Sequence, residues 1–152
     1  MSHLYRAFLQ HLFLLLCIWI ATASAAFAEQ KQQFENYDIH YSLVNTTFLS
    51  PEVARAYKIT RGKNRALVNI AIRKIIDDKT DTAQKASLTG DSNDLMRRYP
   101  LKFTEIIEKD SIYYIAEMKF YNLETRHFTI DVTPAGTTKT YTLKFSKTLY
   151  KD

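Results

Sequence analysis

The sequence contains very little cysteine, tryptophan, glycine or proline. Its 152 residues include one cysteine, one tryptophan, three glycines and three prolines. The single cysteine excludes a disulfide-stapled scaffold, and so few glycines exclude both a collagen-like repeat and a glycine-rich phosphate loop. The 46% hydrophobic content, with 24% charged residues, also excludes a disordered chain. What remains is an ordinary globular protein with a net charge of +5.

The first 28 residues have the layout of a signal peptide. Arg6 precedes an uncharged stretch that extends to Ala28, and its densest apolar run, LFLLLCIWI, covers residues 12–20. Small residues follow in two A-x-A patterns, and we expect cleavage after Ala28. The alternative is an uncleaved membrane anchor, because the uncharged stretch from Ala7 to Ala28 is long enough to span a bilayer as a helix. The short apolar centre favours the signal peptide.

Cleavage after Ala28 removes Cys17 and Trp19, the only residues of their kinds. The remaining domain, residues 29–152, then has no disulfide, no thiol nucleophile and no cysteine-ligated metal. Its stability must come from its core, to which nine tyrosines and six phenylalanines contribute apolar area. We therefore expect a single periplasmic domain that keeps no membrane span after cleavage.

Alternation of apolar and polar residues indicates half-buried strands in most of this domain. The clearest strand covers residues 37–43, where Asp38, His40 and Ser42 occupy the polar face. Further strands are expected at residues 64–76, 84–90, 101–107, 112–120, 128–132 and 141–145. Turn residues at 109–111 and 134–136 separate strands in the last third of the chain, and residues 101–150 are therefore predicted to form a four-strand meander.

One segment favours a helix. Ser50 suits the N-cap position, Pro51 the first helical position and Glu52 the first turn, which predicts about two turns over residues 51–57. About seven short strands with this one helix predict an all-β, antiparallel, immunoglobulin-like β-sandwich. A small closed barrel is the alternative, but the helix would interrupt its first hairpin.

Four segments of the sequence resemble a known family. They are NTTFLSPEVARAY at residues 45–57, RGKNRALVNI at residues 61–70, YYIAE at residues 113–117 and YTLKF at residues 141–145. These segments are similar to a family of small exported proteobacterial proteins described as a domain of unknown function, DUF4426. The resemblance covers nearly all of residues 29–152 and implies a periplasmic β-sandwich of bacterial origin. It implies no activity and no catalytic residues.

The residues that suit metal binding or catalysis form no strong pattern. His40 with Asp38, and His127 with Asp131, would suit zinc or copper if their two strands were neighbours. Such pairs are common on exposed strand faces, so we expect no metal and no cofactor. The sequence has no G-x-S-x-G or H-E-x-x-H motif, and Glu105, Glu108 and Glu117 are typical of cross-strand surface charges. We therefore expect no enzymatic activity.

A cluster of basic residues is the most distinctive polar feature. Arg61, Lys63 and Arg65 lie close together with Asn64 where the predicted helix gives way to a strand. Such a cluster suits phosphate or carboxylate groups, and an exported protein would meet them on anionic lipids, cell-wall polymers or acidic proteins rather than on nucleic acid. The alternative is a solvated loop whose charges protect an edge strand from pairing with other chains.

A second candidate surface contains two tyrosines. Tyr113 and Tyr121, with Ile115 between them, fall on the polar phase of the predicted strand at residues 112–120 and its end. Exposed aromatic side chains of this kind often form binding surfaces. If both faces of the strand are covered, these residues belong to the core instead.

Together these features predict a binding or accessory module of the bacterial envelope that is not an enzyme. Its partner would be an envelope protein or an anionic envelope polymer or lipid, bound through a sheet edge, the basic cluster or the tyrosines. The second hypothesis is a carrier or sensor that holds a small ligand between its sheets. An envelope hydrolase is the third.

Overall fold

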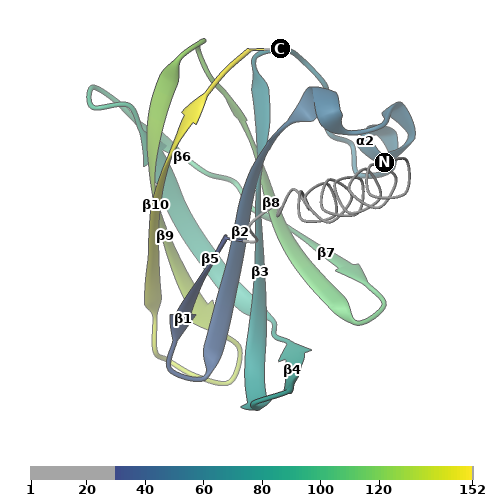
Figure 1. Cartoon of the computed structure of the whole chain (residues 1–152), viewed down its shortest axis with the longest axis vertical. Helices are drawn as coiled ribbons and strands as arrows, with labels where there is room; N and C mark the ends of the chain where they lie inside the picture. The colour runs from purple at the N-terminus through teal and green to yellow at the C-terminus, as the bar shows by residue number, and fades with distance from the viewer. Residues whose placement is uncertain (1–29, 152) are drawn as a thin grey trace, which may run out of the picture.

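The computed structural model describes residues 30–151, which form two antiparallel β-sheets packed face to face (Figure 1). The predicted signal peptide and its cleavage site lie outside the described residues. The all-β sandwich predicted from the sequence is confirmed, and the two separate sheets are not a closed barrel. Within residues 30–151, no helix is long and apolar enough to cross a membrane.

The first sheet has six strands in the order β1-β2-β3-β8-β7, with the short β4 pairing with β3. Its strands are β1 (Gln30–Phe34), β2 (Tyr37–Asn45), β3 (Arg65–Asp77), β4 (Thr80–Ala83), β7 (Thr104–Glu108) and β8 (Ser111–Lys119). The second sheet has four strands in the order β10-β9-β5-β6. They are β5 (Ala86–Asn93), β6 (Arg98–Pro100), β9 (Glu124–Pro134) and β10 (Tyr141–Leu149).

The core lies between the sheets and follows the alternation seen in the sequence. Ile39, Val68 and Ile70 of the first sheet are fully buried, as are Ile130 and Leu143 of the second. Their neighbours along each strand face outward, because successive side chains of a strand point to opposite faces. The predicted strand at residues 37–43 is therefore confirmed with its apolar face inward.

The predicted helix is also confirmed. Helix α2 (Pro51–Ala56) follows a 3-10 turn, η1 (Thr46–Phe48), and both connect β2 to β3. The Ser50 side chain accepts a hydrogen bond from the Val53 backbone N–H at 3.3 Å, which caps the helix as the sequence suggests. Ala54, Ile59 and Leu67 form a small second cluster where this connection covers the outer face of the first sheet.

The predicted four-strand meander is wrong. Strands β7 and β8 form a hairpin in the first sheet, whereas β9 and β10 form a hairpin in the second. The chain crosses between the sheets after β8, at a turn in which Leu123 adopts a positive φ of 62°. Alternation shows which residues face inward but not which sheet a strand joins, so it does not distinguish the two arrangements.

Three short strands were not predicted from the sequence: β1, β4 and β6. The β1 sequence QKQQF has four polar residues before Phe34, and β4 reads TDTA. Both pair on one side only, β1 with β2 and β4 with β3. Strands at a sheet edge need no continuous apolar face, and their composition therefore resembles that of loops.

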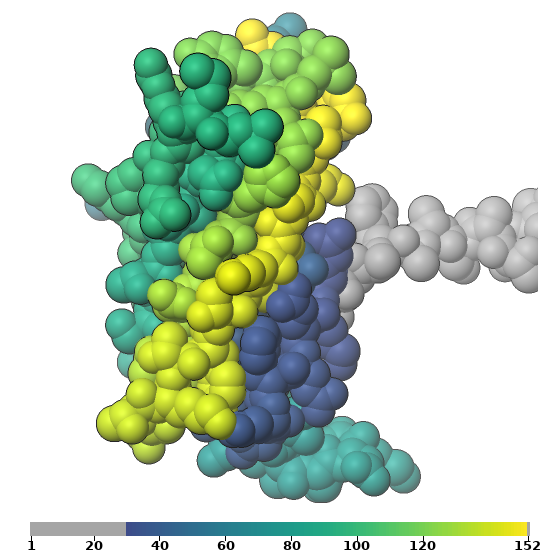
Figure 2. Space-filling view, turned by 90° about the vertical axis from the view of Figure 1, so that its left-hand side faces the viewer, coloured from purple at the N-terminus to yellow at the C-terminus, as the bar shows by residue number. Residues whose placement is uncertain are grey.

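One flank of the sandwich is closed by contacts between β1–β2 and β10. The Gln32 amide donates to the Lys144 backbone carbonyl at 2.8 Å, and the Asn45 amide donates to the Tyr150 carbonyl at 2.9 Å. The Tyr141 hydroxyl donates to the Glu35 carboxylate at 2.7 Å. Figure 2 shows β10 in yellow lying directly against β1 and β2 in purple. We call this the closed flank.

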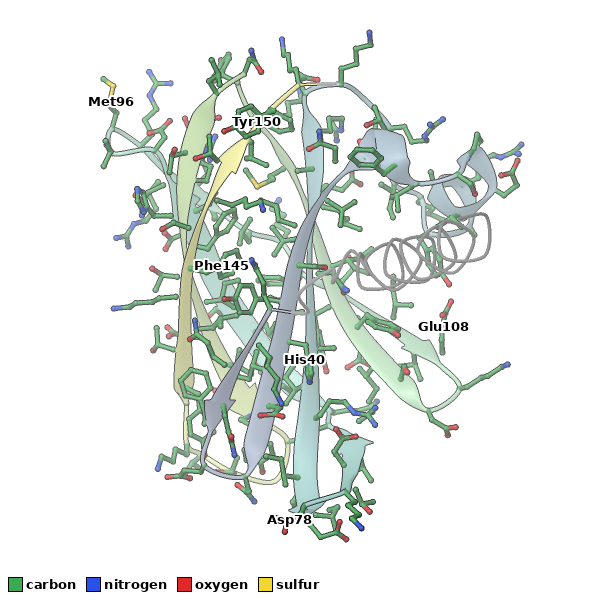
Figure 3. The ribbon with its side chains drawn as sticks, viewed as in Figure 1. His40, Asp78, Met96, Glu108, Phe145 and Tyr150 are labelled. Atoms are coloured by element: carbon green, nitrogen blue, oxygen red, sulfur yellow. The ribbon has the colours of Figure 1, made fainter. Side chains whose placement is uncertain are left out.

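Stacked aromatic rings join the sheets inside the closed flank. Phe145 of β10 points into the space between the sheets (Figure 3). Its ring stacks on Tyr41 of the first sheet with centroids 4.4 Å apart, and on Phe128 of the second sheet with centroids 4.5 Å apart. These three stacked rings thus connect the two sheets of the cysteine-free domain on this side.

Candidate functional site

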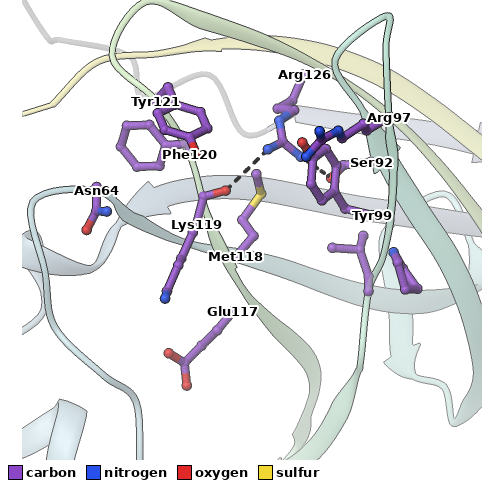
Figure 4. A pocket seen from close by; sticks show the side chains of 12 residues that line it. Asn64, Ser92, Arg97, Tyr99, Glu117, Met118, Lys119, Phe120, Tyr121 and Arg126 are labelled. Atoms are coloured by element: carbon purple, nitrogen blue, oxygen red, sulfur yellow. Dashed lines mark hydrogen bonds between the residues drawn. The ribbon is translucent and has the colours of Figure 1, made fainter.

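The opposite flank contains a cavity of about 470 Å³ between β8 of the first sheet and β6 of the second (Figure 4). Two groups of residues line it. The first group comes from the second sheet and the link that leaves it: Ser92, Arg97, Tyr99, Pro100, Leu101 and Arg126. The second group comes from the first sheet and its end: Asn64, Glu117, Met118, Lys119, Phe120 and Tyr121. We call this space the edge cavity.

Arg126 is the central polar residue of the edge cavity. It occupies an inward position of β9 and is only 2% exposed. Its guanidinium donates to Glu124 Oε1 at 2.7 Å, to Ser92 Oγ at 3.1 Å and to the Lys119 backbone carbonyl at 3.4 Å. The guanidinium carbon also lies 3.9 Å from the centre of the Tyr99 ring. These bonds use three of its five N–H groups, so the other two have no hydrogen-bond partner among residues 30–151.

The loop between β5 and β6 holds Tyr99 in this position. The Asp94 carboxylate accepts hydrogen bonds from the Arg97 backbone N–H at 2.8 Å, the Tyr99 hydroxyl at 2.8 Å and the Met96 N–H at 3.1 Å. The Arg97 backbone bond and then the Tyr99 bond lower the pKa of Asp94 from 3.8 to about 2. The same hydrogen bond raises the pKa of Tyr99. The carboxylate therefore fixes both the hairpin and the ring beneath Arg126.

We expect the Asp94 carboxylate to stabilise the fold in a pH-dependent way. Its folded pKa of about 2 lies below the ordinary value of 3.8, so its contribution is fully present above pH 4 and is lost as the pH falls toward 2. The Asp94→Asn variant should unfold at a lower urea concentration than the wild type at pH 7. This difference in urea midpoint should shrink between pH 4 and pH 2. A difference that stays constant over that range would contradict the assignment.

Along the edge of β8 that borders the cavity, no second strand of residues 30–151 pairs with the backbone. The Phe120 N–H donates to the Asn64 carbonyl at 3.1 Å, so alternate residues of β8 bond to β3 and those between them point away. Glu117 and Lys119 belong to the second set. Strand β7 pairs with β8 only as far as Ile115, and it therefore leaves this stretch uncovered. The Lys119 carbonyl accepts a hydrogen bond from Arg126 across the cavity, which confirms that the backbone groups of this set point away from β3.

The basic cluster predicted from the sequence is divided among different environments. Arg65 forms an ion pair with Glu117 at 2.9 Å, and the Thr60 N–H also donates to this carboxylate at 3.2 Å. Arg61 donates to the Thr47 carbonyl at 3.0 Å. Lys63 is exposed at the surface. Of the cluster, only Asn64 lines the edge cavity.

The two predicted tyrosines lie at different sites. Tyr121 is 75% exposed at the rim of the edge cavity. Tyr113 lies on the outer face of the first sheet, in an apolar groove of about 250 Å³ bordered by α2 and β7. Ile115 lines the same groove and packs against the small cluster beneath α2. The outer face of β8 is thus partly covered, and the tyrosines do not form one surface.

The condition for the metal site considered from the sequence is not met. His40 and Asp38 lie on β2 of the first sheet, and His127 and Asp131 lie on β9 of the second. Asp38 pairs with Lys31 at 2.6 Å, while Asp131 accepts from the Thr142 hydroxyl at 2.7 Å. Across residues 30–151 no group of three or more histidine, cysteine or acidic residues is placed to hold a metal ion.

The acidic residues considered for catalysis lie in separate places. Glu105 accepts from the Tyr114 hydroxyl at 2.8 Å, and burial, with this hydrogen bond, raises the pKa of Tyr114 to about 12. Glu117 pairs with Arg65, and Glu108 lies at the end of β7 in the apolar groove. These three carboxylates do not share one site.

Sequence reasoning missed Arg97, Tyr99 and Arg126. The strand that carries Arg126 was expected to begin at residue 128, whereas β9 begins at Glu124. With the correct start, Arg126 falls on the same phase as Phe128 and is inward. An arginine in the apolar phase of a strand is a signal that the sequence does contain, because a charged residue is rarely buried without a partner.

Comparisons with known proteins give the family and the fold. The pattern of the family described as "Domain of unknown function (DUF4426)" matches residues 31–152. A DUF4426 family protein from Pseudomonas aeruginosa PAO1 is 32% identical, with a TM-score of 0.70 over 82% of this chain and 96% of that chain. No curated protein matches the sequence.

A more distant similarity is found to FetP from uropathogenic Escherichia coli strain F11. It has 10% identity and a TM-score of 0.58 over 82% of this chain and 95% of that chain. A copper-bound variant of FetP gives the same identity and TM-score, with 96% of that chain covered. At 10% identity the similarity shows a shared fold only.

Proposed function

The chain belongs to the DUF4426 family, and we propose that it is a non-catalytic binding module of the bacterial envelope that takes an anionic group of its partner into the edge cavity. The proposal includes export to the periplasm, for which the support is the signal-peptide pattern of residues 1–28. The observation that carries the proposal is the buried guanidinium of Arg126 inside a cavity of about 470 Å³.

The charges around the edge cavity favour an anion. Glu124 balances Arg126, and Arg65 balances Glu117. Arg97 and Lys119 also line the cavity, and within residues 30–151 no carboxylate forms an ion pair with the side-chain charge of either residue. The lining is therefore positive overall. Guanidinium and ammonium groups form charge-assisted hydrogen bonds to carboxylates and phosphates, which are stronger than neutral ones.

The size and lining of the cavity support binding rather than catalysis. Small-ligand sites usually have volumes of a few hundred Å³ and combine apolar walls with few polar groups. Among residues 30–151 no histidine lines this cavity, and the hydroxyl of Ser92 is bonded to Arg126, which cannot accept a proton. The arrangement thus supplies no base for a serine nucleophile. A carrier of a small molecule would use the same cavity and is a possible outcome of the test below.

Photo-crosslinking from the rim of the cavity tests the proposal. The photoreactive residue p-benzoylphenylalanine replaces Tyr121 at the rim, or Phe48 in η1 as the matched control, since both side chains are 75% exposed. The full-length chain is expressed in its native bacterium and irradiated. We expect an adduct from position 121 that position 48 does not give. The Arg97→Glu/Lys119→Glu variant should reduce its yield at least tenfold, which corresponds to about 1.4 kcal/mol of binding free energy.

Two results would overturn the proposal. One is an equal yield, or no adduct, at positions 121 and 48. The other is an adduct whose yield does not change when Arg97 and Lys119 are reversed in charge. Both substituted residues are exposed, so the variant is expected to keep the wild-type urea midpoint, and that measurement is the folding control.

A further inference from the structure

The backbone of β8 narrows the class of ligand. We propose that the partner presents an extended peptide segment, which pairs with the free edge of β8 at Glu117 and Lys119 and places a carboxylate against Arg97 and Arg126. This inference rests on the proposed function, because it concerns the same cavity. It adds the chemical class of the partner and the strand to which that partner binds.

The first argument is the pattern of backbone groups on the edge. The N–H and C=O groups of Glu117 and Lys119 point away from β3, at intervals of two residues along β8. The Lys119 carbonyl already accepts from Arg126 at 3.4 Å, so a bound strand would share this acceptor. An added strand needs this alternation of donors and acceptors, and main-chain hydrogen bonds supply much of the affinity in such complexes. A phosphate group offers acceptors only and would leave the carbonyls without donors, and headgroup ammonium or hydroxyl groups do not repeat at the two-residue interval of the edge. The edge therefore favours a peptide over other anionic ligands.

The second argument is the space beside this edge. Strand β7 covers β8 up to Ile115, and the chain before Thr104 leaves the first sheet to join β6. A peptide beside Glu117 and Lys119 would thus occupy the position that β7 would reach if it continued. The link between β6 and β7 forms the opposite wall of the cavity through Leu101, whose N–H is bonded to the Gly90 carbonyl at 2.9 Å.

The third argument is the division of the lining into polar and apolar parts. Successive side chains of a strand point to opposite faces, so a bound segment would direct every second side chain into the cavity. Met118, Phe120 and Leu101 offer apolar contact there, while Arg97 and Arg126 offer donors to a carboxylate. The segment that fits is short, extended and alternating, with an acidic residue or a terminal carboxylate at the arginines.

Substitution of Lys119 separates backbone pairing from charge. Lys119→Pro removes the N–H that points into the cavity, and this N–H makes no bond to β3, so the ladder between the two strands should remain. Lys119→Ala removes the charge but keeps the N–H, and it is the matched control. We expect Lys119→Ala to lower the yield of the photo-adduct from position 121 by less than tenfold relative to the wild type. Lys119→Pro should lower this yield at least tenfold below that of Lys119→Ala.

A second measurement does not depend on the folding of the proline variant. Mass spectrometry of the protease-digested adduct identifies the captured segment, and a synthetic peptide of that sequence is titrated into the wild-type protein by calorimetry. We expect methylation of the peptide's alternate backbone nitrogens to weaken binding at least tenfold, because it removes the donors to the edge carbonyls. Replacing its acidic residue with the corresponding amide, or amidating a terminal carboxylate, should weaken binding to a similar degree.

The outcomes distinguish this inference from the proposed function. An adduct that contains lipid, polymer or a small molecule would overturn the peptide while leaving an anion-binding cavity in place. Binding that tolerates backbone methylation in both alternate sets would do the same. The absence of any adduct specific to position 121 would instead overturn the proposed function.

Discussion

Replacing Arg126 with alanine is expected to lower the free energy of unfolding by about 3–5 kcal/mol, the range found when one partner of a buried ion pair is removed. The side chains of Arg126 and Glu124 are only 2% and 10% exposed, and Arg126 Nε lies 2.7 Å from Glu124 Oε1. The substitution leaves the Glu124 carboxylate in a poorly solvated position without its counter-ion. It also removes the hydrogen-bond partner of Ser92 and the cation above the Tyr99 ring. Urea unfolding followed by tyrosine fluorescence measures the loss.

Two variants make the Arg126 prediction specific. Arg97→Ala removes an exposed arginine from the same cavity and should change stability by no more than about 0.5 kcal/mol. Arg126→Met/Glu124→Gln removes both charges, while the new amide oxygen at position 124 still accepts from the Tyr121 N–H. This double variant should recover part of the stability that Arg126→Ala loses. Equal effects of Arg126→Ala and Arg97→Ala would show that the buried pair is not important for stability.

Replacing Phe128 with alanine is expected to cost about 3–5 kcal/mol, as large-to-small substitutions of buried aromatic residues do. Phe128 is 1% exposed, and its ring is stacked on Phe145 with an interplanar angle of 9°. Phe145 in turn stacks on Tyr41 of the other sheet. The deletion therefore opens a cavity in the aromatic contact that joins the two sheets. The measurement is the urea midpoint together with the slope of the transition, which should not change.

Two control variants test whether the loss of stability at Phe128 depends on the size and the burial of the side chain. Phe128→Leu keeps much of the buried apolar volume and should cost clearly less than the alanine substitution. Phe48→Ala removes a phenylalanine that is 75% exposed, and it should have little effect. A loss at Phe128 no larger than the loss at Phe48 would contradict the assignment of the aromatic stack to the core.

Local rules predicted the long elements of this fold because their evidence is local. The alternation at residues 37–43 and the Ser50-Pro51 helix start each depend on neighbours in the sequence, and both are confirmed. The predicted meander is wrong because the alternation of apolar and polar residues is the same whether β8 and β9 lie in one sheet or in two facing sheets. Strand β1 was missed because its QKQQF sequence lies at an edge and has almost no apolar face.

The candidate site was only partly visible in the sequence. Asn64 and Tyr121 were singled out for separate reasons, and the fold places both on the edge cavity. Glu124 and Arg126 are two residues apart on β9, but Ser92 lies on β5, so no local spacing in the sequence brings all three together. The unpaired backbone of β8 depends on where β7 stops, which is a property of tertiary structure. The charges of the basic cluster predicted an anion partner, but Arg65 is already occupied by Glu117.

The closed flank limits where a further strand could add to this sandwich. Side chains of β1 and β2 bind the backbone of β10 there, so an incoming strand would have to break those bonds before it could pair. A chain that accepted strands on both flanks would link to further copies and grow into a fibre. If a segment docks at β8 as proposed, the same docking at β10 is unfavourable, because side chains of β1 and β2 already contact the backbone there.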